Sequence, residues 1–237
     1  MIPARTNGPF SWWFARDADM RVRRQFSALR VRGLDRARRA LEQGPVLVVS
    51  NHTSYWDALL VLQLGVRILG ARTFAMMDAT NLRRLPFFAL VGAFGVDRSS
   101  AVDGARAVRY AAKLLAAPRT LVWIFAQGRE TPVTARPLGF HGGSAAVARL
   151  AKDARVLPLA IRYEHGEQPR AIIYVSIGEA VTGDHEAAVV RELDVIEAAL
   201  SGDASGFETV YERGESSWMR VAQAILAIVT RPFALEP

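Results

Sequence analysis

The sequence predicts an α/β fold in which a mainly parallel, mixed sheet is flanked by helices. Short, continuous apolar runs such as residues 46–50 are typical of buried parallel strands, and segments with helical periodicity alternate with them along the chain. The size also fits, because 237 residues with 51% hydrophobic composition suffice for one sizeable core. In folds with this alternation, functional residues concentrate in the loops at the carboxyl ends of the strands. We therefore expect the functional residues of this chain in those loops.

The expected elements follow one another after Gly44-Pro45 breaks the chain. The strand at 46–50 is rich in β-branched residues, and the helix at 103–116 repeats apolar residues at helical spacing before Pro118 stops it. The same signals predict further strands at 73–77, 94–97, 120–126, 156–162 and 171–177, and further helices at 58–64, 81–90, 143–152, 187–200 and 218–230. Gly65 is expected to close the helix at 58–64, and Pro86 to interrupt the helix at 81–90. We expect residues 44–237 to form a single domain.

The positive charge of the chain is concentrated at its start. The whole excess of +7 lies in residues 1–40, where ten arginines face three aspartates and the aromatic residues include Trp12 and Trp13. Such segments meet phosphates, either on an anionic lipid surface or on nucleic acid. Tryptophan beside arginine favours the membrane, because an indole ring settles at headgroup depth. We expect residues 1–43 to be a basic, amphipathic arm of membrane-surface helices, with a nucleic-acid arm and an ordinary solvated helix as alternatives.

Several classes of protein are excluded by what the sequence lacks. Without cysteine there is no disulfide framework, thiolate nucleophile or cysteine metal site, which favours a cytosol-facing location. The longest apolar runs, residues 85–96 and 221–230, are shorter than the roughly 20 residues of a spanning helix. The first residues also lack the pattern of a secretory signal. The expectation is a peripheral protein on the cytoplasmic face of a membrane, with no nucleic acid as partner.

One histidine is distinguished by its position. His52 follows the first predicted strand and Asp57 comes shortly after it, at a spacing that requires a loop rather than one helix face to bring the two together. A carboxylate on one imidazole nitrogen leaves the other free to take a proton from a hydroxyl, as a general base does. The alternative is structural, because Ser54 and Asp57 also fit a capping box at a helix start. The remaining histidines are interpreted as surface or loop residues without a metal cluster: His141, His165 and His185.

Four blocks of sequence, in order, resemble the glycerolipid acyltransferase family, the relatives of 1-acylglycerol-3-phosphate acyltransferase. Asn51-His52 followed by Asp57 matches the family's first motif, Asn-His-x-x-x-x-Asp. The other matches are Gly92 to Arg98 with the second block, Phe125 to Glu130 with the family's Phe-Pro-Glu-Gly-Thr-Arg, and Val156 to Ile161 with its proline-containing fourth block. The resemblance covers roughly half of the chain.

The resemblance implies an O-acyltransferase with a membrane-facing, cytosolic active site. It assigns His52 as the general base that deprotonates an acceptor hydroxyl, Asp57 as the residue that orients His52, and an acyl thioester of coenzyme A or acyl carrier protein as the donor. The reaction requires no metal and no cofactor. The first acceptor to expect is 1-acylglycerol-3-phosphate, as in phospholipid biosynthesis. Its binding is assigned to residues from the first three blocks: Asn51, Arg98, Gln127, Gly128 and Arg129.

The third block departs from the family pattern and leaves the acceptor open. Gln127 stands where the family has glutamate, Arg129 comes one residue before the family's arginine position, and Glu130 occupies that position. A shifted guanidinium still suits two phosphate oxygens, whereas Glu130 would repel them. The alternatives are a phosphate-free or glycosylated lipid acceptor, such as a carotenoid glycoside, and a catalytically silent membrane-binding relative.

Overall fold

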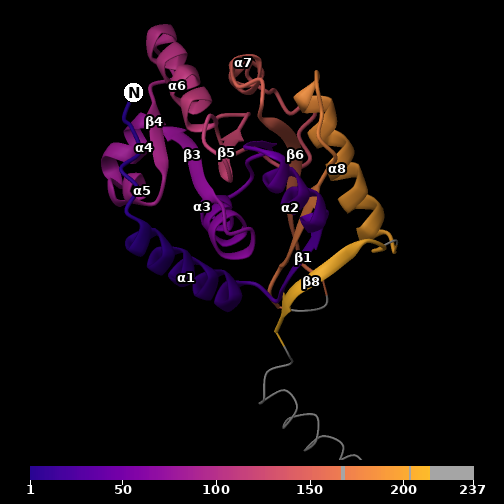
Figure 1. Cartoon of the computed structure of the whole chain (residues 1–237). Helices are drawn as coiled ribbons and strands as arrows, with labels where there is room; N and C mark the ends of the chain where they lie inside the picture. Colours follow the sequence, from indigo (N-terminus) through magenta and orange to yellow (C-terminus); the bar gives the residue numbers. More distant parts are fainter. Residues whose placement is uncertain (167–168, 203, 214–237) are drawn as a thin grey trace, which may run out of the picture.

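A mixed eight-stranded sheet forms the centre of the molecule (Figure 1). The computed structural model describes residues 1–166, 169–202 and 204–213. The strands are β1 (Ala28–Arg32), β2 (Val46–Ser50), β3 (Arg72–Asp78), β4 (Ala93–Val96), β5 (Thr120–Phe125), β6 (Arg155–Glu164), β7 (Ile172–Ile177) and β8 (Phe207–Glu212). Their order is β4-β3-β5-β2-β6-β7-β1-β8. The strands from β4 to β6 are parallel, and antiparallel pairs join β6 to β7 and β1 to β8.

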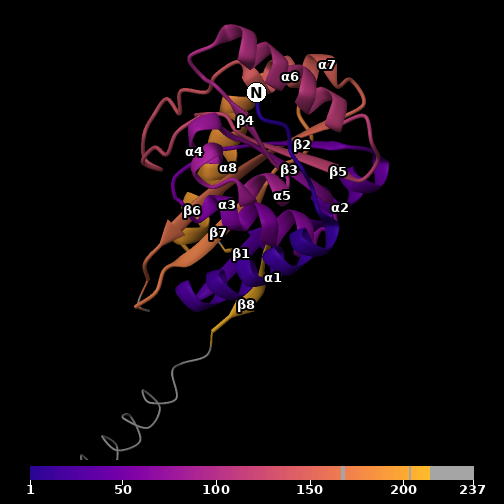
Figure 2. The same cartoon turned by 90° about the vertical axis from the view of Figure 1, so that its left-hand side faces the viewer.

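Helices cover both faces of the sheet (Figure 2). They are α1 (Gly8–Gln25), α2 (Leu34–Gln43), α3 (Asp57–Val61) with its π-helical continuation η1 (Leu62–Ile68), α4 (Ala79–Arg84), α5 (Phe87–Leu90), α6 (Ala101–Leu114), α7 (Gly143–Leu150) and α8 (His185–Leu200). Alternate residues of β2 point to opposite layers: Val46 and Val48 join the core with α1, α2 and α3, whereas Leu47 and Val49 join the core with α6 and α7. The predicted fold class is confirmed.

Most predicted elements are present, with small differences at their ends. The helix expected at 58–64 does not end at Gly65 but continues as η1. The segment 81–90 is interrupted at Pro86, as predicted, and forms α4 and α5. Strands β1 and β8 were not predicted. In β1, buried Leu29 and Val31 alternate with Arg30 and Arg32. This strand was missed because its two arginines look, in the sequence, like part of the basic arm. The helix expected at 218–230 lies outside the described residues.

Residues 1–43 are not a separate arm, so the expected division at residue 44 is corrected. β1 pairs with β7 and β8 inside the sheet, and α2 buries Leu34 and Leu41 in the same core. α1 lies against α3 and η1, and its Asp19 Oδ1 accepts a hydrogen bond of 2.7 Å from the buried Gln63. The physical reason is the apolar side of each segment, which can only be buried against the rest of the domain.

Among the residues that the structure describes, none of the helices combines the length and the apolar character that crossing a membrane requires.

The substitution Leu29→Ala tests whether β1 belongs to the cooperative core. Leu29 is fully buried, so truncation leaves a cavity, and we expect the free energy of unfolding to fall by about 3 kcal/mol. Urea denaturation followed by circular dichroism measures the change. Met20→Ala on the exposed side of α1 is the control, with an expected change below about 1 kcal/mol. Equal effects of the two substitutions would contradict the placement of Leu29.

Candidate active site

The candidate site lies along the edge of the sheet where the parallel strands end. His52 follows β2, Arg98 follows β4 and residues 127–129 follow β5. Because β2, β4 and β5 belong to the parallel part of the sheet, their carboxyl ends face the same edge. The sheet therefore brings together three loops that are far apart in the sequence.

His52 and Asp57 form the predicted pair. Nδ1 of His52 lies 2.8 Å from Oδ2 of Asp57, and the loop from Thr53 to Trp56 returns the chain so that Asp57 opens α3. A carboxylate oxygen accepts, so this contact places the proton on Nδ1 and leaves Nε2 as the acceptor nitrogen. The His52 side chain is 21% exposed, whereas that of Asp57 is fully buried. The arrangement can therefore offer one basic nitrogen to a ligand.

Asp57 accepts four hydrogen bonds. Besides His52, Oδ2 accepts from the backbone N–H groups of Thr53 at 2.8 Å and Ser54 at 3.0 Å. Oδ1 accepts from the hydroxyl of Tyr163 at 2.6 Å. The two interpretations of Asp57 from the sequence are thus not exclusive, because one carboxylate binds both the histidine and the backbone before α3. A buried carboxylate needs such donors to offset its desolvation.

Tyr163 is a member of the site that the sequence did not reveal. It lies near the end of β6, where its ring packs against Phe26 with centroids 5.3 Å apart. Burial, together with the charge and hydrogen bond of Asp57, raises the pKa of Tyr163 well above its ordinary value. The phenol therefore stays protonated and donates to Asp57. No motif of the family marks Tyr163, because the fourth block ends at Ile161 and Tyr163 lies beyond it in β6.

The backbone and ring of His52 are also fixed. Its N–H donates to Oε1 of Gln127 at 2.6 Å, and its carbonyl accepts from the N–H of Thr131 at 2.8 Å. The imidazole stacks on Phe125, with ring centroids 4.4 Å apart and planes 24° from parallel. The backbone contacts tie the loop after β2 to the loop after β5, and Phe125 and Asp57 hold the imidazole ring.

Two residues expected to bind substrate instead hold the strands and loops together. The buried amide of Asn51 donates to the carbonyl of Ile161 and accepts from its N–H, both at 2.8 Å, and so links the ends of β2 and β6. The buried Gln127 holds the His52 backbone, and its Nε2 has no hydrogen-bond partner among the described residues. Neither side chain lines the cavity of the site, so the assignment of Asn51 and Gln127 to direct contact with substrate is corrected.

Arg98 and Gly128 meet at the edge of the same site. Nη1 of Arg98 donates to the carbonyl of Gly128 at 2.6 Å. Gly128 has a φ of +66°, and a Cβ there would lie 3.1 Å from the Arg98 guanidinium carbon, so glycine permits the close approach. The group that lies against the backbone of Gly128 is therefore the guanidinium of Arg98. Arg129 is exposed beside it, and no described carboxylate forms an ion pair with either arginine.

A large cavity connects these residues to the interior. Its volume is about 1160 Å³, and His52, Arg98, Gly128, Arg129 and Glu130 lie on its wall. Much of the remaining wall is apolar and comes from β3, β4, β5, α5 and α6; its large side chains include Phe74, Met76, Phe88, Val91, Val108 and Ile124. The site therefore joins a polar group of residues to an extensive apolar surface.

The other histidines differ in their surroundings. His141 is exposed and lines the cavity, and His165 is exposed on a loop. His185 was expected on the surface but is buried at the start of α8, where Nδ1 lies 3.0 Å from Oγ of Ser144 and burial lowers its pKa. Within the described ranges, no three His, Cys, Asp or Glu residues gather in a way that could hold a metal ion.

Comparison with known protein families agrees with this geometry. Residues 28–162 match the family described as Acyltransferase, a span that covers more than half of the chain and includes β1 to β5 and most of β6. A comparison with curated proteins finds no match. The matched span contains the four blocks noted in the sequence together with His52, Asp57, Arg98 and residues 127–129. The predicted family is confirmed: the chain belongs to the glycerolipid acyltransferases, the family that includes the 1-acylglycerol-3-phosphate acyltransferases.

Proposed function

We propose that the protein transfers a fatty acyl group from an acyl thioester to the hydroxyl of 1-acylglycerol-3-phosphate, with His52 as general base and Asp57 as its orienting partner. The observation that carries the proposal is the contact of 2.8 Å between Nδ1 of His52 and Asp57, on the wall of a large and mostly apolar cavity. The cavity volume of about 1160 Å³ exceeds the roughly 300–1,000 Å³ of common ligand sites, which suits a long acyl chain.

The proposed reaction is a single displacement at the thioester carbonyl. Nε2 of His52 takes the proton of the acceptor hydroxyl while its oxygen attacks the carbonyl carbon. The C–O bond forms, the C–S bond breaks, and the departing thiolate takes the proton back from the imidazolium. The Asp57 carboxylate stabilises the positive imidazole ring between these two steps. The donor is the thioester of coenzyme A or of acyl carrier protein, and the chemistry requires no metal or cofactor.

Arg98 and Arg129 are the proposed partners of the acceptor phosphate. Both line the cavity beside His52, and a guanidinium can bind two phosphate oxygens. Gly128 contributes by letting Arg98 approach the loop. The replacement of the family's glutamate by Gln127 does not count against a phosphate, because Gln127 holds the backbone of His52 and does not line the cavity.

A phosphate-free or glycosylated lipid is the second candidate acceptor. The observation that favours it is Glu130, an exposed carboxylate on the cavity wall next to Arg129. Its charge would repel a phosphate, whereas its oxygens would accept hydrogen bonds from sugar hydroxyls. A catalytically silent relative is less consistent with the site, because the contacts that orient His52 are complete.

The exposed side of α1 is the proposed contact with an anionic membrane at its cytoplasmic face. Trp13, Arg16, Met20 and Arg24 recur at helical spacing along it, and all four are exposed. Trp12 and Trp13 are 52% and 57% exposed. Asp17 and Asp19 pair with Arg21 and Arg23, which leaves Arg16 and Arg24 for lipid phosphates. Tryptophan and arginine together are typical of helices that lie at the membrane interface.

The substitution His52→Ala is expected to lower kcat by about 100- to 10,000-fold, because it removes the proposed base. The assay follows thiol release from palmitoyl-coenzyme A and the acylated lipid by mass spectrometry, with liposomes and 1-acylglycerol-3-phosphate. His165→Ala is the matched control, since this histidine is exposed and lies outside the cavity. Turnover retained by folded His52→Ala protein would refute the mechanism.

The double substitution Arg98→Ala/Arg129→Ala distinguishes the two acceptors. Loss of two charge-assisted hydrogen bonds should reduce kcat/KM for 1-acylglycerol-3-phosphate by about 10- to 100-fold or more. The value for a monoacylglycerol, which has no phosphate, should change much less. Wild-type enzyme that acylates only phosphate-free or glycosylated acceptors would replace the first proposal with the second.

The double substitution Trp12→Ser/Trp13→Ser is expected to weaken binding to vesicles of phosphatidylglycerol and phosphatidylcholine by about tenfold or more, because two interfacial rings are lost. Vesicle co-sedimentation measures the partition. Val102→Ser on α6 is the control, because Val102 is an equally exposed apolar residue on another helix. Unchanged binding of the tryptophan variant would show that α1 is not the contact.

A further inference from the structure

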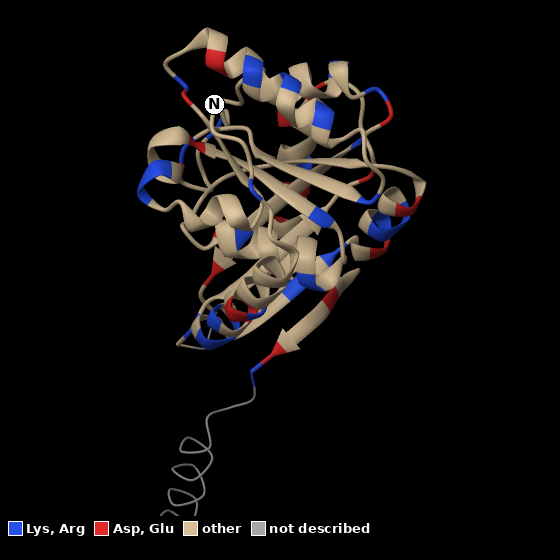
Figure 3. Cartoon of the chain, turned by 60° about the vertical axis from the view of Figure 1, so that its left-hand side comes forward, with Lys and Arg blue, Asp and Glu red and all other residues tan. Residues whose placement is uncertain are grey.

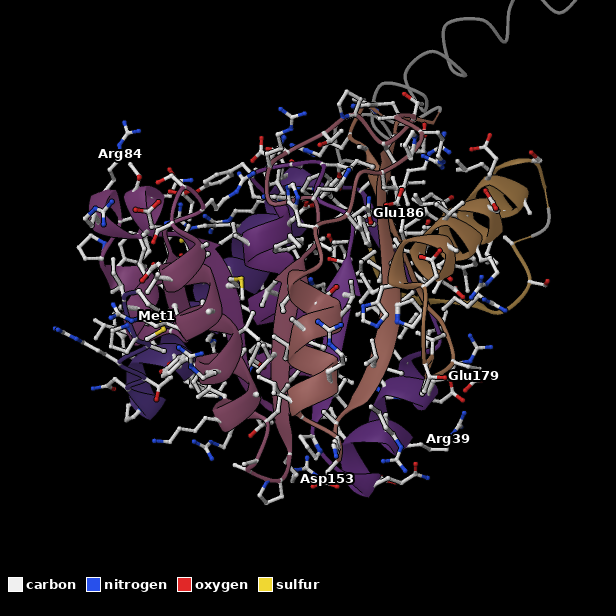
Figure 4. All side chains as sticks on the ribbon, turned by 90° about the horizontal axis from the view of Figure 1, so that it is seen from above. Met1, Arg39, Arg84, Asp153, Glu179 and Glu186 are labelled. Atoms are coloured by element: carbon white, nitrogen blue, oxygen red, sulfur yellow. The ribbon has the colours of Figure 1, made fainter. Side chains whose placement is uncertain are left out.

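A second charged surface lies on the layer of α6 and α7. Arg106, Arg109 and Lys113 recur at helical spacing along the exposed side of α6. Figure 3 shows blue, basic positions along this helix. Arg149 near the end of α7 and Lys152 just after it are also exposed, and α7 packs beside α6 (Figure 4). These five residues are called the α6–α7 cationic face. It contains both lysines of the chain.

The charge of this face is not compensated by ion pairs. Within the described part of the chain, none of its five residues forms one. The nearest acid on α6, Asp103, is buried and bound to the amino group of Met1, and Asp153 is exposed beside Lys152. Some arginines on other helices have partners, as in the pairs Arg21 with Asp17 and Arg39 with Asp35. The face is thus free to attract an external anion.

The cationic face adjoins the cavity of the candidate site. Val108 and Arg109 of α6 and Ala146 and Leu150 of α7 line that cavity, so its wall is formed directly beneath the charged surface. Exposed apolar side chains accompany the charges: Val102 is 64% exposed and Leu150 is 56% exposed. Positive charge around a few apolar residues, beside an active-site cavity, suits an acidic protein that delivers a substrate on a flexible arm.

The position of the face disfavours a lipid surface as its occupant. α6 and α7 pack on the sheet face opposite to the one that α1 covers (Figure 2). The tryptophans of α1 lie on the other side of the molecule, so one flat membrane cannot contact both surfaces. No aromatic residue is exposed on α6 or α7 in the described structure.

We propose that the α6–α7 cationic face docks an acidic acyl carrier protein, which presents its thioester to the cavity between these helices and His52. The proposal rests on the proposed function, because it assigns the route by which one of the two thioester donors arrives. Charge complementarity would both steer the encounter and select the carrier over other soluble proteins.

The test compares Arg106→Glu/Lys113→Glu with the matched control Arg38→Glu/Arg191→Glu. Both variants change the net charge equally, the control residues are exposed on α2 and α8, and none of the four residues lines the cavity. The readout is the ratio of kcat/KM for palmitoyl-acyl carrier protein to kcat/KM for palmitoyl-coenzyme A. Like charges facing each other oppose association strongly, so we expect this ratio to fall at least about tenfold in the first variant only. Direct titration with the carrier protein should show the same loss of affinity.

The outcomes separate this proposal from the proposed function. An unchanged ratio, or equal losses in both charge-reversal variants, would overturn docking on this face. Wild-type protein that uses palmitoyl-coenzyme A but neither binds nor uses the carrier would overturn docking and leave acyl transfer intact. If wild type uses neither thioester, acyl transfer fails, and the titration with carrier still decides the docking. Loss of vesicle binding by Arg106→Glu/Lys113→Glu, without loss of carrier binding, would assign the face to lipid instead.

Discussion

The structure of the site depends on the burial of one carboxylate. Asp57 has no contact with solvent, and its two oxygens accept hydrogen bonds from His52, Thr53, Ser54 and Tyr163. A buried charge without such partners would cost several kcal/mol. The loop after β2, the start of α3 and the end of β6 must therefore adopt one mutual arrangement. That arrangement fixes the orientation of the His52 ring, on which the proposed proton transfer depends.

Buried amides extend this constraint to the neighbouring strands. Asn51 binds both backbone groups of Ile161 in β6, and Gln127 binds the N–H of His52 from the loop after β5. The proposed base is thus connected to the strands on both sides of β2. Gln127 keeps an acceptor where the family has a carboxylate, at the cost of a buried Nε2 without a described partner. The departures from the family pattern that line the cavity are instead Arg129 and Glu130.

The sequence predicted the parallel half of the fold and the pair of His52 and Asp57, because both have local signals. Continuous apolar strands such as β2 are buried on both faces, and His52 with Asp57 follows one of them in a short motif. The signal was misleading for β1, whose Arg30 and Arg32 suggested a surface arm although Leu29 and Val31 are buried. Tyr163 could not be predicted, since its contact with Asp57 joins residues 106 positions apart. For the same reason, the sequence could not show that Asn51 binds β6 and not a substrate.

The two layers of helices give the proposed reaction a spatial order. A lipid acceptor remains in the membrane, whereas a thioester donor arrives from solution, so an enzyme that uses both needs two separate approaches to one reactive nitrogen. α1 carries exposed tryptophans on one side of the sheet, and α6 carries on the other side cations that form no ion pair with any described residue. The cavity beside His52 has wall residues from both layers, including Val61 at the end of α3 and Val108 in α6. A sheet whose strands end between the two layers would let the two proposed approaches meet at His52.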